Sequence, residues 1–135
     1  CILERMDDSQ LRKLTEFRAK LLYVDFWASW CSSCAQSFLF MNQLQSELGH
    51  DGLKVLAINL DEKKSEADAF LKTHKATFQI MHDSTKECAS SFGVIAMPTT
   101  FIVGADRRIK LIHQGYKASE SAEMKSLIKG FLAER

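Results

Sequence analysis

Proline is almost absent from this sequence, which has only Pro98 in 135 residues, and glycine occurs only six times. These counts exclude collagen-like and low-complexity disordered chains. No apolar run approaches the roughly 20 residues that span a bilayer. Positive and negative side chains nearly balance, with a net charge of +1, which leaves no basic field for nucleic acid or a membrane surface. We therefore expect a soluble globule with no nucleic-acid partner and no membrane insertion, folded as one domain over residues 1–135.

Cysteine is also scarce, and of Cys1, Cys31, Cys34 and Cys88 only the middle two have the spacing of a motif. This argues against a disulfide framework and for a reactive pair in a domain that folds on its own core. Cys88 is interpreted as a small buried hydrophobe rather than a third redox centre. The sequence leaves open whether Cys1 is a cloning remnant or a lipid-modified residue. Because the chain begins there rather than at Met, we expect a mature form without its signal or anchor.

Histidines are few and scattered, at His50, His74, His82 and His113. A structural zinc site needs about four ligands, and no second cysteine pair or histidine cluster accompanies Cys31 and Cys34. Each histidine is therefore interpreted as a surface or packing residue. We expect neither a metal nor another cofactor.

The chain is organised around the stretch from Tyr23 to Cys34. Leu21–Trp27 is nearly unbroken in its hydrophobicity, which is typical of a central parallel strand covered on both faces, with Trp27 in the core. After the cysteines, apolar residues recur at helical spacing as far as Leu48, and Gly49 is expected to end that helix in a left-handed conformation.

The remaining segments alternate between the two periodicities. Strands are predicted at 53–60, 78–81, 99–103 and 109–113, and helices at about 65–74, 84–92 and 119–131. Ser84 and Glu87 have the spacing of a capping box that opens the helix carrying Cys88. Asp7-Asp8-Ser9 is a plausible turn between two brief N-terminal strands. This order predicts an α/β fold with a mixed sheet.

The two cysteines are assigned complementary chemical roles. Cys31, placed at the first turn of a helix, faces unpaired backbone N–H groups and the positive end of the helix dipole, which favour its thiolate. It is the predicted nucleophile, with a structural or metal-bound cysteine as the alternative. Cys34, one turn later, is the predicted resolving thiol, less exposed and less acidic than Cys31.

Three other residues near the motif have both a functional and a structural interpretation. Ser32 and Ser33 suit a helix N-terminus, or their hydroxyls tune the redox potential by donating to the Cys31 thiolate. Asp25 is either a partly hydrated strand residue or backbone-capping acid, or a buried acid whose raised pKa lets it exchange a proton with Cys34 through a water. Trp30 either packs beneath the motif or contributes an apolar docking surface.

Trp-Cys-Ser-Ser-Cys at a strand-to-helix junction, together with Met97-Pro98-Thr99 some sixty residues later, resembles the thioredoxin superfamily. The closest likeness is the TlpA/ResA-like branch of thiol-disulfide oxidoreductases. The resemblance implies a thioredoxin-like fold, with a central mixed sheet flanked by helices on both faces and a short N-terminal hairpin within residues 2–20. It also implies a cis Met97–Pro98 bond beside the cysteines.

The same resemblance implies a function. The chain is expected to exchange its dithiol or disulfide with protein substrates, as a monomer, with Trp30, Met97, Pro98 and Thr99 binding the substrate. Relatives in this branch mostly act as reductants in the bacterial envelope, where a membrane partner keeps them reduced. The residues themselves are equally compatible with a cytoplasmic location.

This sequence also departs from the branch. Ser32-Ser33 lacks the proline that usually precedes the second cysteine, and Ser37 and Leu39 stand where relatives often carry a glutamate and a helix-kinking proline. Ala57 stands where thioredoxins often place a lysine near the buried acid, which should raise the pKa of Asp25 further. Two alternatives to a thiol-disulfide oxidoreductase are a peroxiredoxin-like peroxidase and a metal-binding or scaffold module that uses the fold without redox turnover.

Overall fold

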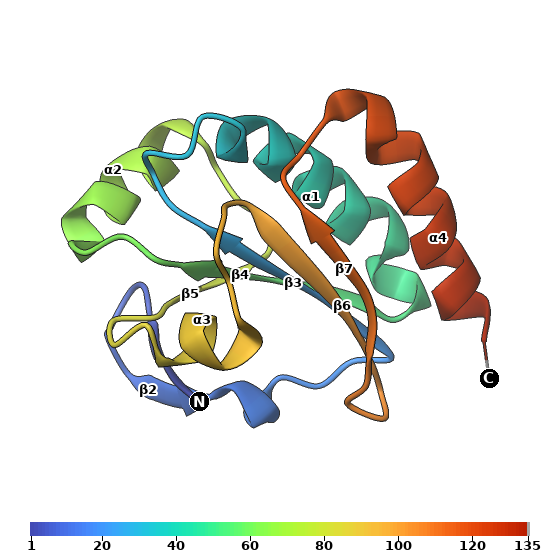
Figure 1. The fold of residues 1–135 in the computed structure, drawn as a ribbon, viewed down its shortest axis with the longest axis horizontal. Coiled ribbons are helices and arrows are strands. Elements are labelled where there is room, and N and C mark those ends of the chain that lie inside the picture. The colour runs from blue at the N-terminus through green and yellow to red at the C-terminus, as the bar shows by residue number, and fades with distance from the viewer. Residues whose placement is uncertain (135) are drawn as a thin grey trace.

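The computed structural model describes residues 1–134 and contains one mixed sheet (Figure 1). Its strands are β1 (Ile2–Arg5), β2 (Leu11–Lys13), β3 (Leu21–Trp27), β4 (Leu53–Asn59), β5 (Gln79–His82), β6 (Thr99–Gly104) and β7 (Ile109–Gln114). Their order across the sheet is β2-β1-β5-β4-β3-β6-β7. β3, β4 and β5 run parallel, whereas β1 and β6 lie antiparallel to these core strands.

Helices cover both faces of this sheet. They are α1 (Cys34–Leu48), α2 (Lys64–Thr73), α3 (Glu87–Phe92) and α4 (Ser121–Ala133), with short 3₁₀ helices η1 (Leu14–Glu16), η2 (Gly49–Asp51) and η3 (Ala118–Glu120). Side chains from α1, α2 and α4 share one hydrophobic cluster, and those from α3 and η1 share the other (Figure 1). The expected thioredoxin-like α/β fold is therefore confirmed. Within residues 1–134, no helix is both long and apolar enough to cross a membrane.

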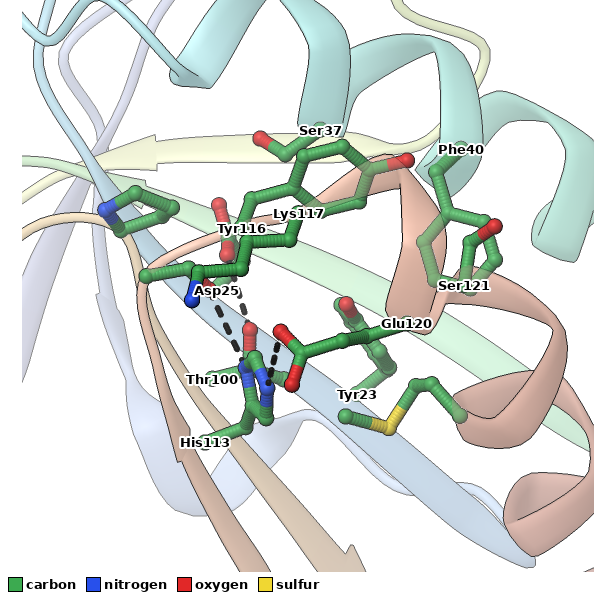
Figure 2. Close-up of a pocket in the computed structure, with 13 residues that line it drawn as sticks. Tyr23, Asp25, Ser37, Phe40, Thr100, His113, Tyr116, Lys117, Glu120 and Ser121 are labelled. Atoms are coloured by element: carbon green, nitrogen blue, oxygen red, sulfur yellow. Dashed lines mark hydrogen bonds and ion pairs between the residues drawn. The ribbon is translucent and has the colours of Figure 1, made fainter.

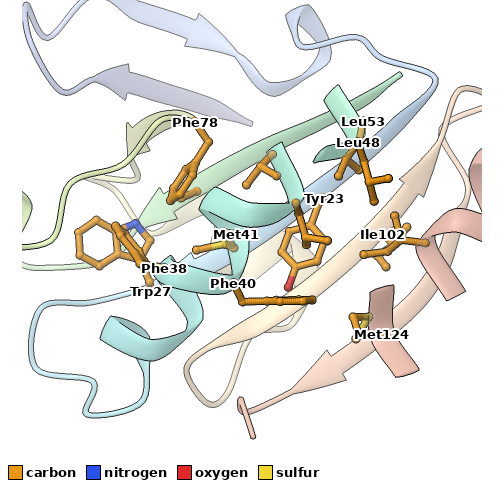
Figure 3. Close-up of a cluster of buried hydrophobic side chains, with 14 of the residues drawn as sticks. Tyr23, Trp27, Phe38, Phe40, Met41, Leu48, Leu53, Phe78, Ile102 and Met124 are labelled. Atoms are coloured by element: carbon orange, nitrogen blue, oxygen red, sulfur yellow. The ribbon is translucent and has the colours of Figure 1, made fainter. Parts of the chain in front are cut away.

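β3 is an interior strand between β4 and β6, and every one of its seven residues is buried. Successive side chains of a strand point to opposite faces. Tyr23 and Trp27 accordingly enter the cluster beneath α1, where Trp27 packs edge-on against Phe38 (Figure 3). Val24 and Phe26 enter the cluster beneath α3. Asp25 is the one charged residue of β3. The alternation places it on the α1 face of the sheet, between Tyr23 and Trp27.

The expected N-terminal hairpin is present, and β1 also joins the sheet by pairing with β5. A disulfide joins Cys1 to Cys88 of α3, at a Cα–Cα distance of 5.3 Å. Cys88 is therefore buried as interpreted, but its sulfur is disulfide-bonded, which the expectation against a disulfide framework did not anticipate. Cys88 is fully buried, and its bonded partner, Cys1, lies 87 positions earlier in the chain.

Two expected helix ends differ from the structure. Gly49 keeps right-handed φ and continues into η2, and Gly52, with φ of 107°, is the left-handed glycine that turns the chain into β4. The capping box of Ser84 and Glu87 does not form, because α3 begins only at Glu87. Instead the buried carboxylate of Asp83 accepts the backbone N–H groups of Cys88 and Ala89 at 3.3 and 2.9 Å.

Candidate active site

The motif cysteines form a disulfide just past the C-terminal end of β3, where the chain passes into α1, with a Cα–Cα distance of 5.4 Å. Cys31 lies in a turn ahead of the helix, where the N–H of Cys34 donates to its carbonyl at 3.2 Å. The expectation that Cys31 stands in the first helical turn is therefore wrong by three residues, because α1 begins at Cys34. Cys31 still precedes the positive end of the helix dipole. It is 7% exposed, and Cys34 is 0% exposed, so a partner molecule reaches Cys31 first.

A buried acid that sequence reasoning missed holds the turn before Cys31. Asp61, just past the end of β4, accepts the N–H and the hydroxyl of Ser29 at 3.0 and 2.8 Å, and an amide N–H of Asn59 at 2.8 Å. These bonds satisfy a fully buried carboxylate. They also tie the segment that carries Trp30 and Cys31 to the neighbouring strand. The available signal was an acid at the end of a predicted core strand, where side chains of adjacent parallel strands meet.

The two serines between the cysteines occupy different environments. The hydroxyl of Ser33 lies 3.7 Å from the Cys31 sulfur. Ser32 is exposed. Of the two hydroxyls proposed to tune the motif, Ser33 therefore has the contact that such tuning requires, and the tuning itself stays a prediction.

The loop before β6 contains the expected cis bond between Met97 and Pro98. β3 and β6 pair in a register that sets Phe26 opposite Thr99. The loop before β6 therefore lies at the same end of these strands as the cysteines. Met97 is half-buried, whereas the Pro98 and Thr99 side chains are buried. Trp30 does not pack beneath the motif, since it is 68% exposed.

Asp25 of β3 is buried below the motif, with 1% of its surface exposed. One of its carboxylate oxygens accepts a hydrogen bond from the Thr100 hydroxyl at 3.1 Å. The other oxygen has no hydrogen-bond partner among the described residues. Burial raises the pKa of Asp25 to about 8, and the Thr100 hydroxyl opposes this rise only in part. The residue opposite on β4 is Ala57, which supplies no compensating charge. The alternative of a hydrated strand position is therefore wrong.

The raised pKa predicts how stability depends on pH. Between the ordinary value of 3.8 and about 8, folded Asp25 holds a proton that the unfolded chain has released, so the free energy of unfolding falls as pH rises. One pH unit corresponds to about 1.36 kcal/mol, so the loss that Asp25 contributes from pH 5 to pH 7 is on the order of 3 kcal/mol. Urea unfolding of oxidised protein should show this loss.

Asp25→Asn is the matched variant, because its side chain has nearly the same shape and does not titrate. We expect the variant to be more stable than the wild type at pH 7 and to lack this part of the pH dependence. Equal slopes for the two proteins between pH 5 and pH 7 would show that Asp25 is ionised in the folded state.

Among residues 1–134, no group of three or more His, Cys, Asp or Glu side chains is placed to hold a metal ion. His82 is buried and uses its Nε2 on the Asp61 carbonyl at 2.8 Å. His74 stacks on Phe70 with ring centroids 4.1 Å apart, and His50 is exposed. The groups at the candidate site that can take part in a reaction are therefore the two motif cysteines and the buried Asp25.

A family model described as Redoxin matches residues 3–128. The thiol-disulfide oxidoreductase ResA of Geobacillus thermodenitrificans is 31% identical over 108 residues, which are 80% of this chain and 62% of that protein. The thioredoxin-like protein YneN of Bacillus subtilis is 32% identical over 115 residues, covering 83% of this chain and 66% of that protein. The chain thus spans a little less than two thirds of the length of these curated relatives.

Solved structures of thioredoxin-like proteins are similar to this chain as well. A structure assigned as a thiol:disulfide interchange protein, DsbE, from Chlorobium tepidum superposes with a TM-score of 0.92 at 32% identity, over 98% of this chain and 93% of that one. StoA from Bacillus subtilis superposes with a TM-score of 0.76 at 20% identity, over 95% of each chain, and supports the fold alone. With a model match over nearly its whole length and a neighbour alike in both fold and sequence, the chain belongs to the Redoxin family, in the ResA-like branch of the thioredoxin superfamily.

Proposed function

We propose that this protein is a thiol-disulfide oxidoreductase that exchanges disulfides with protein substrates. The observation that carries the proposal is the Cys31–Cys34 pair at disulfide distance, with the outer sulfur slightly exposed and the inner one buried. Such an arrangement gives the two sulfurs different access to a large partner. The names of the ResA and DsbE relatives support the same activity.

The reaction balances within the motif and the substrate. The Cys31 thiolate attacks one sulfur of a substrate disulfide, forming a mixed disulfide and releasing the other substrate sulfur as a thiolate. Cys34 then loses its proton and attacks the Cys31 sulfur, which releases the second substrate thiolate and leaves the motif oxidised. Asp25, once it has released its own proton, is the proposed acceptor of the Cys34 proton through an intervening water, since it is a buried acid with one oxygen unpaired.

Substrate binding is assigned to the groups that the structure leaves accessible. Trp30 offers an exposed apolar side chain beside Cys31, and the half-buried Met97 offers its backbone to an extended segment. Pro98 and Thr99 are buried, so their part is to shape the loop. We propose that the protein acts as a monomer on such substrates.

We further propose that the protein works as a reductant in the bacterial cell envelope, kept reduced by a membrane partner. The Cys1–Cys88 bond supports this location over the cytoplasm. Structural disulfides persist in oxidising compartments such as the periplasm and are rare where glutathione and thioredoxin keep thiols reduced.

Equilibration with dithiothreitol or glutathione buffers tests both the activity and its direction. We expect Cys31–Cys34 to titrate reversibly with a reduction potential near or below that of thioredoxin, about −270 mV. Peptide mapping of alkylated protein separates this pair from Cys1–Cys88. A potential near −120 mV, as in DsbA, would indicate an oxidant. A pair that cannot be reduced and reoxidised would contradict the proposed activity.

Ser33→Ala tests redox tuning in the same titration. A hydroxyl that donates to the Cys31 thiolate stabilises the reduced form, so its loss should lower the potential, by roughly 10–30 mV for a hydrogen bond of about 0.5–1.5 kcal/mol. Ser32→Ala is the matched control and should leave the potential unchanged. An equal shift in both variants would assign the effect to the loop backbone rather than to the Ser33 hydroxyl.

A further inference from the structure

Three polar side chains form a row across neighbouring strands beneath the motif. The sheet register sets Asp25 of β3 opposite Thr100 of β6, and Thr100 opposite His113 of β7. Residues opposite one another in paired strands project from the same face. Two strand spacings put the Asp25 and His113 backbones roughly 10 Å apart. His113 is therefore on the same side of the sheet as the buried acid, two strands nearer the edge.

A cavity of about 20 Å³ joins the members of this row, and all three line it (Figure 2). Space of roughly 10–15 Å³ is enough for one water when polar groups surround it. Among the lining residues, Asp25, Ser37 of α1 and Pro98 are buried, and we call the part of the cavity that they line its inner end. The unpartnered oxygen of Asp25 is the buried polar atom in this region that still needs a hydrogen bond.

The outer end of the cavity lies between β7 and η3, where His113 meets Glu120. The Nδ1 of His113 lies 3.1 Å from the Gly115 carbonyl, a contact that requires a proton on Nδ1 and leaves Nε2 as the acceptor in the neutral ring. Nε2 lies 3.5 Å from a Glu120 carboxylate oxygen. His113 is half-buried and Glu120 is exposed, so this pair spans the boundary between cavity and solvent.

The other groups around the row do not provide an equivalent route. Tyr23 of β3 is buried with its pKa raised chiefly by burial, and the pKa of Tyr116 is also raised by burial. Lys117, which is exposed, also lines the cavity, but a lysine ammonium is a hydrogen-bond donor with no lone pair to accept a proton. The residues that α1 and α4 contribute to the lining, among them Ser37, Ser121 and Met124, do not titrate.

We propose that His113 and Glu120 form the outer end of a proton path that connects Asp25 with solvent. The inference rests on the proposed function, because the proton concerned leaves Cys34 during disulfide exchange. Because folded Asp25 holds a proton at neutral pH, it first passes that proton through the cavity water to Nε2 of His113, and the imidazolium releases it to Glu120 or to water. The Asp25 carboxylate that results then takes the proton of Cys34. The reverse sequence returns a proton when the motif is reduced. Both residues are positioning residues, since neither touches the reacting sulfurs.

A pH-jump experiment on the oxidised protein tests the path without any thiol chemistry. Infrared absorption of the protonated Asp25 carboxyl, identified by its loss in Asp25→Asn, reports the rate at which this group releases its proton after a jump from below to above its pKa. We expect His113→Gln, which retains a donor for the Gly115 carbonyl, to slow that release roughly tenfold. This is less than the roughly 10²–10⁴-fold effect of a group that transfers the proton at the reacting atom itself.

Added imidazole should restore the rate in His113→Gln at constant pH, which a purely structural role for His113 would not produce. Glu120→Gln, at an exposed position, should slow release to a smaller extent and guards against misfolding of the first variant. His50→Gln replaces an exposed histidine in η2, outside the cavity, and should behave as wild type. Wild-type rates in both His113→Gln and Glu120→Gln, or a slower rate that imidazole does not restore, would overturn the proposal.

Insulin reduction by dithiothreitol separates this inference from the proposed function. If the wild type fails to accelerate insulin reduction while His113→Gln slows proton release, the proposed function is wrong and the path stands. If the wild type reduces insulin but proton release is the same in all variants, the path is wrong and the function stands. If both hold, insulin turnover by His113→Gln at low buffer concentration should rise with added imidazole.

Discussion

A Cys34→Ser variant is expected to accumulate a mixed disulfide between Cys31 and its substrate. Cys31 is the sulfur that a partner reaches first, and Cys34 is 0% exposed. In the wild type the mixed disulfide is short-lived because Cys34 attacks intramolecularly, and well-oriented intramolecular groups act at effective concentrations of roughly 10⁵–10⁸ M. Serine cannot make that attack. We therefore expect the complex to approach one equivalent per chain and insulin turnover to fall by about 10³-fold or more.

The measurement is intact-mass spectrometry of reduced Cys34→Ser after incubation with glutathione disulfide and, separately, with insulin. Peptide mapping should locate the new bond at Cys31. Cys31→Ser is the matched control, because it retains the other motif cysteine but removes the accessible one, and it should form little complex and reduce no insulin. Equal trapping through Cys34 in that control would reverse the assigned roles. No complex with either probe would contradict the exchange mechanism.

The central strand and the motif could be predicted from sequence because their signals are local. Leu21–Trp27 was predicted as a core strand and is β3 in the structure, since a nearly unbroken apolar run that includes aromatic and β-branched side chains suits a strand buried on both faces. Cys31 and Cys34 are only three positions apart, so the local chain alone brings their sulfurs close enough to form a disulfide. The cis bond before Pro98 followed from the family resemblance, because nothing in the local composition requires it.

Features that depend on strand register could not be predicted. The row from Asp25 through Thr100 to His113 joins residues 75 and 13 positions apart, and a slip of one residue in either pairing would turn a member to the opposite face. His113 therefore had no visible connection to the site. The Asp61 contacts to Ser29 are hidden for the same reason, since they cross from one strand end to the next.

Helix caps and the second disulfide illustrate how tertiary contacts override local signals. Ser84, the expected cap, instead donates its hydroxyl to Glu4 of β1 at 3.1 Å. Its neighbour Asp83 takes over the N-terminal N–H groups of α3. Cys88 was correctly placed on an inward face, yet its partner could not be recognised, because only the pairing of β1 with β5 brings Cys1 near α3.

Breaking the Cys1–Cys88 bond should be the most destabilising change outside the motif. The bond links residues 87 positions apart, and the chain-entropy model gives about 4.6 kcal/mol for a closed loop of that length. Cys1→Ser removes the bond at its half-buried end and leaves the fully buried Cys88 in place as a thiol. We expect the free energy of unfolding in urea to fall by about 2–5 kcal/mol, the usual range for a lost native disulfide.

The comparison requires Cys31–Cys34 to be oxidised in both proteins, so that only one bond differs. A Cys31→Ser/Cys34→Ser double variant is the matched control, because its lost bond spans three positions rather than 87 and should cost much less. Since the Cys1–Cys88 bond ties the N-terminal strand to α3, faster amide exchange in β1 and α3 should accompany the loss in Cys1→Ser. An unchanged urea midpoint with unchanged exchange would show that packing of Leu3 and Met81 in the same cluster already holds the hairpin in place without the covalent link.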